Sequence, residues 1–213
     1  MTAFSRFAIP KHPRIPYTIY IMKTVLFIPG FQEDLTSRDY AKTIHVIERA
    51  GYDVKFVPIN WFRTTIEQWV DELNAVYDQY EPADVILAGF SYGAMTAFMA
   101  ATKRSPAAVW CFSMSPFFRE DLTQLGYFTS WLKAIGRHRQ ESFMKLEFAR
   151  LVKLISSDML FFYGETELKH WTDITYRHSV VAKIPRAQEI FIPHAKHDVT
   201  GDPYIEAIAS TIA

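Results

Sequence analysis

Residues 85–101 read VILAGFSYGAMTAFMAA, and three kinds of local sequence follow one another there without a gap. Residues 85–88 are a branched, apolar run that is typical of a buried strand. Residues 89–93 form a Gly-x-Ser-x-Gly pattern with Ser91 at its centre, and the alanine- and methionine-rich residues 94–101 favour a helix. The sequence therefore predicts a strand, a tight turn and a helix in direct succession.

Short apolar runs alternate with helical patterns along the chain from residue 23 onward. For the first helix, Thr36 or Ser37 is the expected start and Gly51 the expected end, while Thr65 and Gln68 have the spacing of a capping box for the second. This alternation predicts an α/β fold with a three-layer, doubly wound, mostly parallel sheet of about six strands and helices on both faces. Besides 85–88, the expected strands are residues 24–28, 54–57, 109–114, 159–163 and 189–192, and the expected helices are residues 38–50, 65–80 and those from 203 onward.

Size and charge restrict the class of protein. The chain has 213 residues, of which 49% are hydrophobic, and this is enough for one domain with one sizeable core. Basic and acidic residues balance at 23 each, so no net field attracts nucleic acid or a polyanion. We expect the partner to be a small, weakly charged molecule, and the oligomeric state is not predicted by these features.

The number of cysteines and the hydropathy of the chain indicate the cellular compartment in which the protein is expected. The single cysteine, Cys111, lies in an apolar run, which predicts a buried thiol and fits a reducing environment. No apolar run approaches the length of a membrane-spanning helix, and the N-terminus lacks the pattern of a signal peptide. We therefore expect a cytoplasmic protein without a membrane span.

Two segments differ from the repeating pattern. Residues 1–22 contain basic but no acidic side chains, so we expect an N-terminal arm, an extra edge strand or a targeting segment ahead of a single domain at residues 23–213. Residues 116–155 form an aromatic-rich, partly helical insertion between two expected strands. This insertion either acts as a small cap over the site or packs as an ordinary surface helix.

The Gly-x-Ser-x-Gly pattern carries the clearest chemical signal. A serine hydroxyl is a poor nucleophile unless it is held where a base can take its proton, and a sharp strand-to-helix turn would project Ser91 from the end of the sheet. Gly89 and Gly93 suit a turn in which neighbouring backbone comes close, and the helix N-terminus favours negative charge on a bound oxygen. Ser91 is therefore the candidate nucleophile, although the same five residues also occur as a purely structural turn.

This strand, turn and helix with its serine motif resembles the α/β-hydrolase family, and the resemblance extends from Thr24 to the C-terminus. In that family the nucleophile, the acid and the histidine follow in this chain order, each after a strand. The resemblance implies the α/β-hydrolase fold and a Ser-His-acid catalytic triad.

The resemblance also implies the other two members of the triad. Residues 164–167 resemble the family's Gly-x-x-Asp acid turn with glutamate in place of aspartate, which makes Glu167 the implied acid, with Glu165 and Asp158 as alternatives. Residues 192–198 resemble the loop that carries the family's catalytic histidine, which is His197 here, with His194 as the alternative.

The oxyanion hole is implied in the same way. The family takes its donors from the backbone N–H after the nucleophile and from another in the loop after the first main strand, which here are those of Tyr92 and Phe31. Residues 28–32 resemble the family's His-Gly loop with proline in place of histidine. The side chain of Gln32 either adds a donor or faces solvent.

These features predict an enzyme that hydrolyses a carboxylic ester or a similar small acyl compound through an acyl-enzyme intermediate. An acyltransferase, a thioesterase or a carbon–carbon bond hydrolase could use the same triad, and a non-catalytic binding protein could keep the same fold. The sequence contains no phosphate loop, dinucleotide turn or zinc helix, so no cofactor is expected. With one cysteine and no second cluster of ligands, no metal site is expected either.

Overall fold

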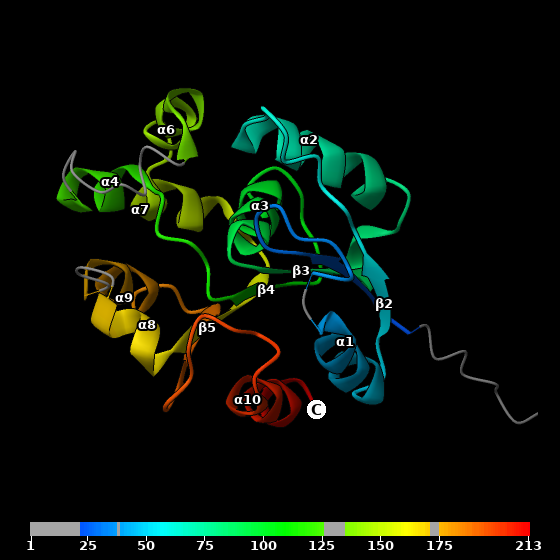
Figure 1. Ribbon diagram of the computed structural model, residues 1–213. Helices are drawn as coiled ribbons and strands as arrows, with labels where there is room; N and C mark the ends of the chain where they lie inside the picture. The colour runs from blue at the N-terminus through cyan, green and yellow to red at the C-terminus, as the bar shows by residue number, and fades with distance from the viewer. Residues whose placement is uncertain (1–21, 38, 126–134, 171–174) are drawn as a thin grey trace, which may run out of the picture.

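Six parallel strands form one sheet in the order β2-β1-β3-β4-β5-β6 (Figure 1). The computed structural model describes residues 22–37, 39–125, 135–170 and 175–213, and the predictions for residues 1–21 lie outside this part. The doubly wound, parallel sheet expected from the sequence is confirmed. Its strands are β1 (Thr24–Ile28), β2 (Asp53–Phe56), β3 (Val85–Phe90), β4 (Ala108–Phe112), β5 (Asp158–Gly164) and β6 (Ala187–Ile192).

Helices cover both faces of the sheet and complete three layers (Figure 1). The helices α1 (Tyr40–Arg49) and α10 (Asp202–Ile212) pack on one face, and α2 (Ile66–Tyr77) and α3 (Tyr92–Ala101) pack on the other. The remaining short elements are η1 (Pro82–Asp84), α4 (Arg119–Leu125), α6 (Arg137–Phe143), α7 (Phe148–Leu151), η2 (Val152–Leu154), α8 (Glu165–His170) and α9 (Thr175–Val181).

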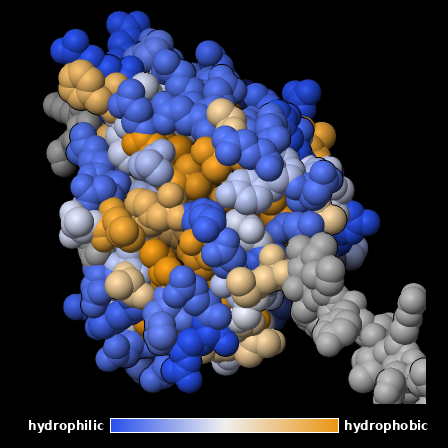
Figure 2. Space-filling model, turned by 90° about the vertical axis from the view of Figure 1, so that its right-hand side faces the viewer, coloured by the Kyte–Doolittle hydropathy of each residue, from blue (hydrophilic) through white to orange (hydrophobic). Residues whose placement is uncertain are grey.

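The central strands are apolar on both faces because both faces are covered. In β1, Leu26 and Ile28 join the core beneath α2 and α3, whereas Val25 and Phe27 join the core beneath α1 and α10. Successive side chains of a strand point to opposite faces, so a strand between two helical layers needs a continuous apolar run. At the β2 edge of the sheet, Figure 2 shows a band of apolar side chains between hydrophilic regions.

The predicted start of α1 is wrong, and a competing turn explains the error. The helix begins at Tyr40 after Asp39. The hydroxyls of Thr36 and Ser37 instead donate to the carboxylate of Asp34, at 2.7 and 3.0 Å. Short polar side chains often prefer such local bonds to a helix cap. These bonds, led by that of Thr36, hold the pKa of the Asp34 carboxyl below its usual value.

Two other predicted helix ends are confirmed. Gly51 follows α1 with a φ of 91°, which lies in the left-handed region that glycine enters without strain. At the start of α2, the backbone N–H of Thr65 donates to Oε1 of Gln68 at 3.0 Å, as the capping-box spacing predicts.

The described part of the 116–155 insertion packs on the same side of the sheet as α2 and α3 (Figure 1). Within it, the ring of Phe143 lies 5.8 Å from Tyr92 and 5.7 Å from Phe117. Further along, the buried Arg177 of α9 forms an ion pair with Asp121 of α4. The insertion is thus joined to the turn after Ser91 by aromatic contacts, and its action as a cap stays a prediction.

The buried thiol expected from the sequence is confirmed. Cys111 is buried, and burial raises the pKa of its thiol. Along the described ranges, every helix is too short or too polar to cross a bilayer.

Candidate active site

Ser91 occupies a strained turn between β3 and α3. Its φ of 57° lies in the left-handed region, which residues other than glycine rarely adopt. The turn is held by the backbone: the N–H of Ser91 donates to the carbonyl of Phe112 at 3.0 Å, and its carbonyl accepts from the N–H of Met95 at 3.2 Å. The predicted turn is therefore present, and it lies at the carboxyl end of the sheet.

The two glycines of the motif lie where other residues would collide with the backbone. A Cβ atom built on Gly93 would lie 2.3 Å from the carbonyl oxygens of Ile28 and Pro29, and one built on Gly89 would lie 2.4 Å from Gly93. These approaches are too short for any real Cβ atom. The close contact at Gly93 also shows that the loop after β1 lies directly against the N-terminus of α3.

We expect Gly93→Ala to lower the free energy of unfolding by about 2–4 kcal/mol or to prevent folding, because the new methyl group forces rigid backbone apart. Urea denaturation followed by circular dichroism would measure the change. The matched control is Gly201→Ala, since Gly201 has a φ of −69° and its nearest contact would be an ordinary 3.4 Å. A Gly93→Ala protein as stable as the control would show that the close packing is wrong.

A chain of hydrogen bonds joins the three residues proposed as a triad. Oγ of Ser91 lies 3.0 Å from Nε2 of His197, and Nδ1 of His197 lies 3.1 Å from Oε2 of Glu167. The three residues follow β3, β6 and β5, whose carboxyl ends meet at one edge of the sheet. The side chain of His197 is 31% exposed and that of Glu167 is 7% exposed, so the imidazole can reach solvent while the carboxylate is enclosed.

The carboxylate of Glu167 is fixed by donors that the sequence did not reveal. Its Oε1 accepts from Oγ of Ser113 at 2.5 Å and from the N–H of Gly164 at 3.1 Å. Ser113 is also hydrogen-bonded to the hydroxyl of Tyr204, which donates to the carbonyl of Phe162 at 3.2 Å. Burial and the nearby charge of Glu167 raise the pKa of Tyr204, so this hydroxyl keeps its proton. One carboxylate oxygen is thus satisfied by the protein and the other faces His197.

The alternative residues lie elsewhere. Glu165 accepts the backbone N–H of His194 at 2.9 Å, and the exposed imidazole of His194 lies 3.6 Å from the same carboxylate. Residues two apart on a helix point in nearly opposite directions, so Glu165 and Glu167 cannot both face His197. Asp158 is exposed at the start of β5, at the other end of the strand.

A second serine hydroxyl contacts Ser91. Oγ of Ser115 lies 3.0 Å from Oγ of Ser91, and its backbone N–H donates to the carbonyl of Ser91 at 3.3 Å. Ser115 is 1% exposed. Ser113 and Ser115 follow β4, which lies beside β3 in the sheet. The expected strand at residues 109–114 placed them only at or just beyond its end, and this was the one available sequence signal.

The two backbone donors expected for an oxyanion lie in adjoining segments. The rings of Phe31 and Tyr92 are 5.0 Å apart, and Gly30 donates its N–H to the hydroxyl of Tyr40 at 3.0 Å, which anchors the loop after β1. Within the described ranges, the N–H groups of Phe31 and Tyr92 donate to no protein acceptor. Their role as oxyanion donors stays a prediction.

Within the described parts of the chain, no group of three or more His, Cys, Asp or Glu side chains could hold a metal ion.

Of the two positions expected for Gln32, the structure shows the exposed one, and the backbone φ of this residue is 59°.

No protein-family model matches the chain, and no curated protein sequence matches it. Its fold does match solved structures. Est1E from Butyrivibrio proteoclasticus, solved with ferulic acid bound, superposes with a TM-score of 0.70 at 15% identity, over 89% of this chain and 86% of that one. α/β hydrolase domain-containing protein 10 from mouse superposes with a TM-score of 0.61 at 16% identity, over 89% of this chain and 87% of that one. The esterase domain of a Rhodothermus marinus protein superposes with a TM-score of 0.60 at 16% identity, over 91% of this chain and 85% of that one.

Identities this low show the fold alone. The chain has the α/β-hydrolase fold, as the resemblance in its sequence predicts.

Proposed function

We propose that the protein is a serine hydrolase that cleaves a carboxylic ester or a similar small acyl compound through an acyl-enzyme intermediate. The observation that carries this proposal is the unbroken hydrogen-bond chain from Ser91 through His197 to Glu167. The hydrolases and esterases among the structural neighbours support it as analogies of fold.

In the first half of the proposed reaction, Oγ of Ser91 attacks the acyl carbon while Nε2 of His197 takes the hydroxyl proton. The carbonyl electrons move to oxygen, and the N–H groups of Phe31 and Tyr92 donate to that oxyanion. When the carbonyl re-forms, the bond to the leaving alcohol breaks and His197 gives its proton to the alcohol. The product of this half is an ester of Ser91.

In the second half, water attacks the acyl carbon and gives a proton to His197. The bond to Oγ of Ser91 then breaks, His197 returns the proton to Ser91, and the carboxylic acid leaves. The part of Glu167 is to orient the imidazole and to stabilise the imidazolium that forms.

Acyl transfer, thioester hydrolysis and carbon–carbon bond hydrolysis could use the same three side chains. Measuring which of these substrates the protein turns over therefore tests the proposal of ester hydrolysis. We expect saturable hydrolysis of p-nitrophenyl acetate or butyrate, with a product burst if deacylation is slower than acylation. Turnover confined to thioesters, or seen only with an added acyl acceptor, would select another of these classes. A folded protein that turns over none of these compounds would favour a binding function.

We expect Ser115→Ala to lower kcat by about tenfold with little change in KM, because the buried hydroxyl of Ser115 contacts Oγ of Ser91 and orients the nucleophile. Ser115→Thr retains a hydroxyl and should restore most of the rate. The control is Ser157→Ala, since Ser157 is a buried serine that donates to the carbonyl of Pro106 away from the site. A Ser115→Ala enzyme with the wild-type kcat would rule out this positioning role.

A further inference from the structure

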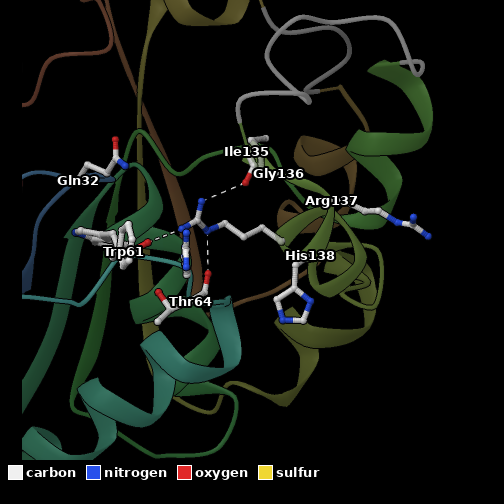
Figure 3. A pocket seen from close by; sticks show the side chains of 10 residues that line it. Gln32, Trp61, Thr64, Ile135, Gly136, Arg137 and His138 are labelled. Carbon is white, nitrogen blue, oxygen red and sulfur yellow. Dashed lines mark hydrogen bonds between the residues drawn. The ribbon is translucent and has the colours of Figure 1, made fainter.

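A pocket of about 440 Å³ lies beside the loop that carries Phe31 (Figure 3). Its walls come from Gln32, from residues 61–64 after β2, and from residues 135–139 at the start of α6. Aromatic and basic side chains line it together, and none of the described residues that line it is acidic. The size suits a small organic ligand, since ligand pockets usually span about 300–1,000 Å³.

Arg139 is a fixed cation in this wall. Its Nε donates to the carbonyl of Thr64 at 2.8 Å, its Nη1 to that of Ile135 at 3.1 Å, and its Nη2 to that of Trp61. The dashed lines in Figure 3 end at these three labelled residues. A guanidinium has five N–H donors, so two remain for a ligand. Because the guanidinium is already held in place, little conformational freedom is lost when an anion binds to it.

The described part of the protein does not cancel the charge of Arg139. Carbonyl oxygens are neutral, and among the described residues no carboxylate forms an ion pair with Arg139. Other arginines in the same chain differ: Arg104 pairs with Asp78, and the buried Arg177 pairs with Asp121. An arginine that is partly buried and fixed only by neutral groups keeps its full attraction for an anion.

Two further residues of the pocket, Arg63 and Trp61, add positive charge and aromatic surface to that of Arg139. The guanidinium of Arg63 lies over the ring of Phe62 at 5.1 Å, the ring is 72% exposed, and no carboxylate of the described residues pairs with Arg63. Trp61 is 6% exposed, and its indole N–H has no acceptor within the described ranges. The pocket thus offers uncompensated positive charge beside aromatic surface.

The pocket adjoins the proposed active site through one layer of side chains. The guanidinium of Arg139 lies 4.9 Å from the centre of the Phe31 ring, and that ring lies 5.0 Å from Tyr92, the residue after Ser91. A ligand held by Arg139 therefore lies next to the loop that would bind the oxyanion.

We propose that this pocket binds an organic carboxylate with an aromatic or aliphatic body, and that the substrate is an ester bearing a free carboxylate at the end held here. The statement about the substrate rests on the proposed function, whereas the binding of a carboxylate does not. Arg139 and Arg63 bind the charge, and the aromatic residues contact the apolar body.

Binding is tested without catalysis in the Ser91→Ala protein, by calorimetric titration with 4-phenylbutyrate and with its neutral amide. The carboxylate should bind at least about tenfold more tightly than the amide, and added salt should reduce the difference. Arg63→Gln and Arg139→Lys should each weaken carboxylate binding several-fold. Arg104→Gln is the control, because Arg104 pairs with Asp78 at 2.8 Å and is not among the residues that line the pocket.

The substrate is tested by comparing the 4-nitrophenyl monoester of glutaric acid with its neutral methyl ester. The anionic ester should have a kcat/KM at least about tenfold higher, and Arg63→Gln should reduce this preference several-fold with little change for the neutral ester. Equal binding of carboxylate and amide, or binding that Arg63→Gln and Arg139→Lys leave unchanged, would overturn the pocket assignment even if both esters were hydrolysed. Carboxylate binding in a protein that hydrolyses neither ester would overturn the proposed function and the substrate, and would retain the binding site.

Discussion

Ser91→Ala is expected to lower kcat for p-nitrophenyl butyrate by at least about 10⁴-fold, because without Oγ no acyl-enzyme can form. Any remaining rate would come from substrate binding and the oxyanion donors acting on a direct attack by water. Initial rates with wild-type and variant protein at equal concentration would measure the loss. Circular dichroism and thermal unfolding would show that the variant is folded.

His197→Ala provides an internal check on the same prediction. Residues that act as a unit give losses that do not add, so the double variant Ser91→Ala, His197→Ala should be about as slow as either single variant. His194→Ala is the matched control, because His194 is exposed and pairs with Glu165 instead. A Ser91→Ala protein that keeps more than about a tenth of the wild-type rate contradicts the nucleophile assignment.

Glu167→Gln is expected to lower kcat by about 10³-fold, and the hydrogen bonds around the carboxylate give the reason. Ser113 and Gly164 both donate to Oε1, so the oxygen of the new amide must take that position. The amide NH₂ then faces Nδ1 of His197, which can pair with it only as an acceptor. That tautomer carries its proton on Nε2 and cannot take the proton of Ser91.

Glu165→Gln is the matched control for this substitution, since it changes the neighbouring glutamate in the same short helix. The variant should keep nearly the full rate, because Glu165 binds the backbone of His194. The pH profile of kcat in both variants would separate a change of histidine tautomer from a general loss of structure. If Glu165→Gln loses the activity and Glu167→Gln keeps it, the assignment of the acid is reversed.

The sheet and the turn that carries Ser91 could be predicted because their signals are local. The branched runs of the central strands and the Gly-x-Ser-x-Gly turn each lie within a few consecutive residues, and each segment agrees with the final fold. The error at the start of α1 also has a local cause. Asp34 attracts the hydroxyls of Thr36 and Ser37, and a count of cap-forming residues does not weigh this alternative.

The surroundings of the site could not be predicted because they depend on which strands become neighbours. Ser113 and Ser115 contact Glu167 and Ser91 because β4 lies between β3 and β5, and nothing within residues 113–115 shows this. The choice between Glu165 and Glu167 depends on which side of α8 faces His197. The pocket around Arg139 joins segments more than 70 residues apart, since its Nε donates to Thr64.

The most direct test of the proposed serine hydrolase is the intact mass after treatment with a fluorophosphonate, followed by peptide mapping. This reagent forms a covalent bond with a serine whose hydroxyl is activated by a base. We predict a single adduct on Ser91 in the wild-type protein, no adduct in His197→Ala, and a much slower reaction in Glu167→Gln. A folded wild-type protein that forms no adduct, or one that is labelled equally well in His197→Ala, would contradict the assignment of Ser91 and His197 as a working catalytic pair.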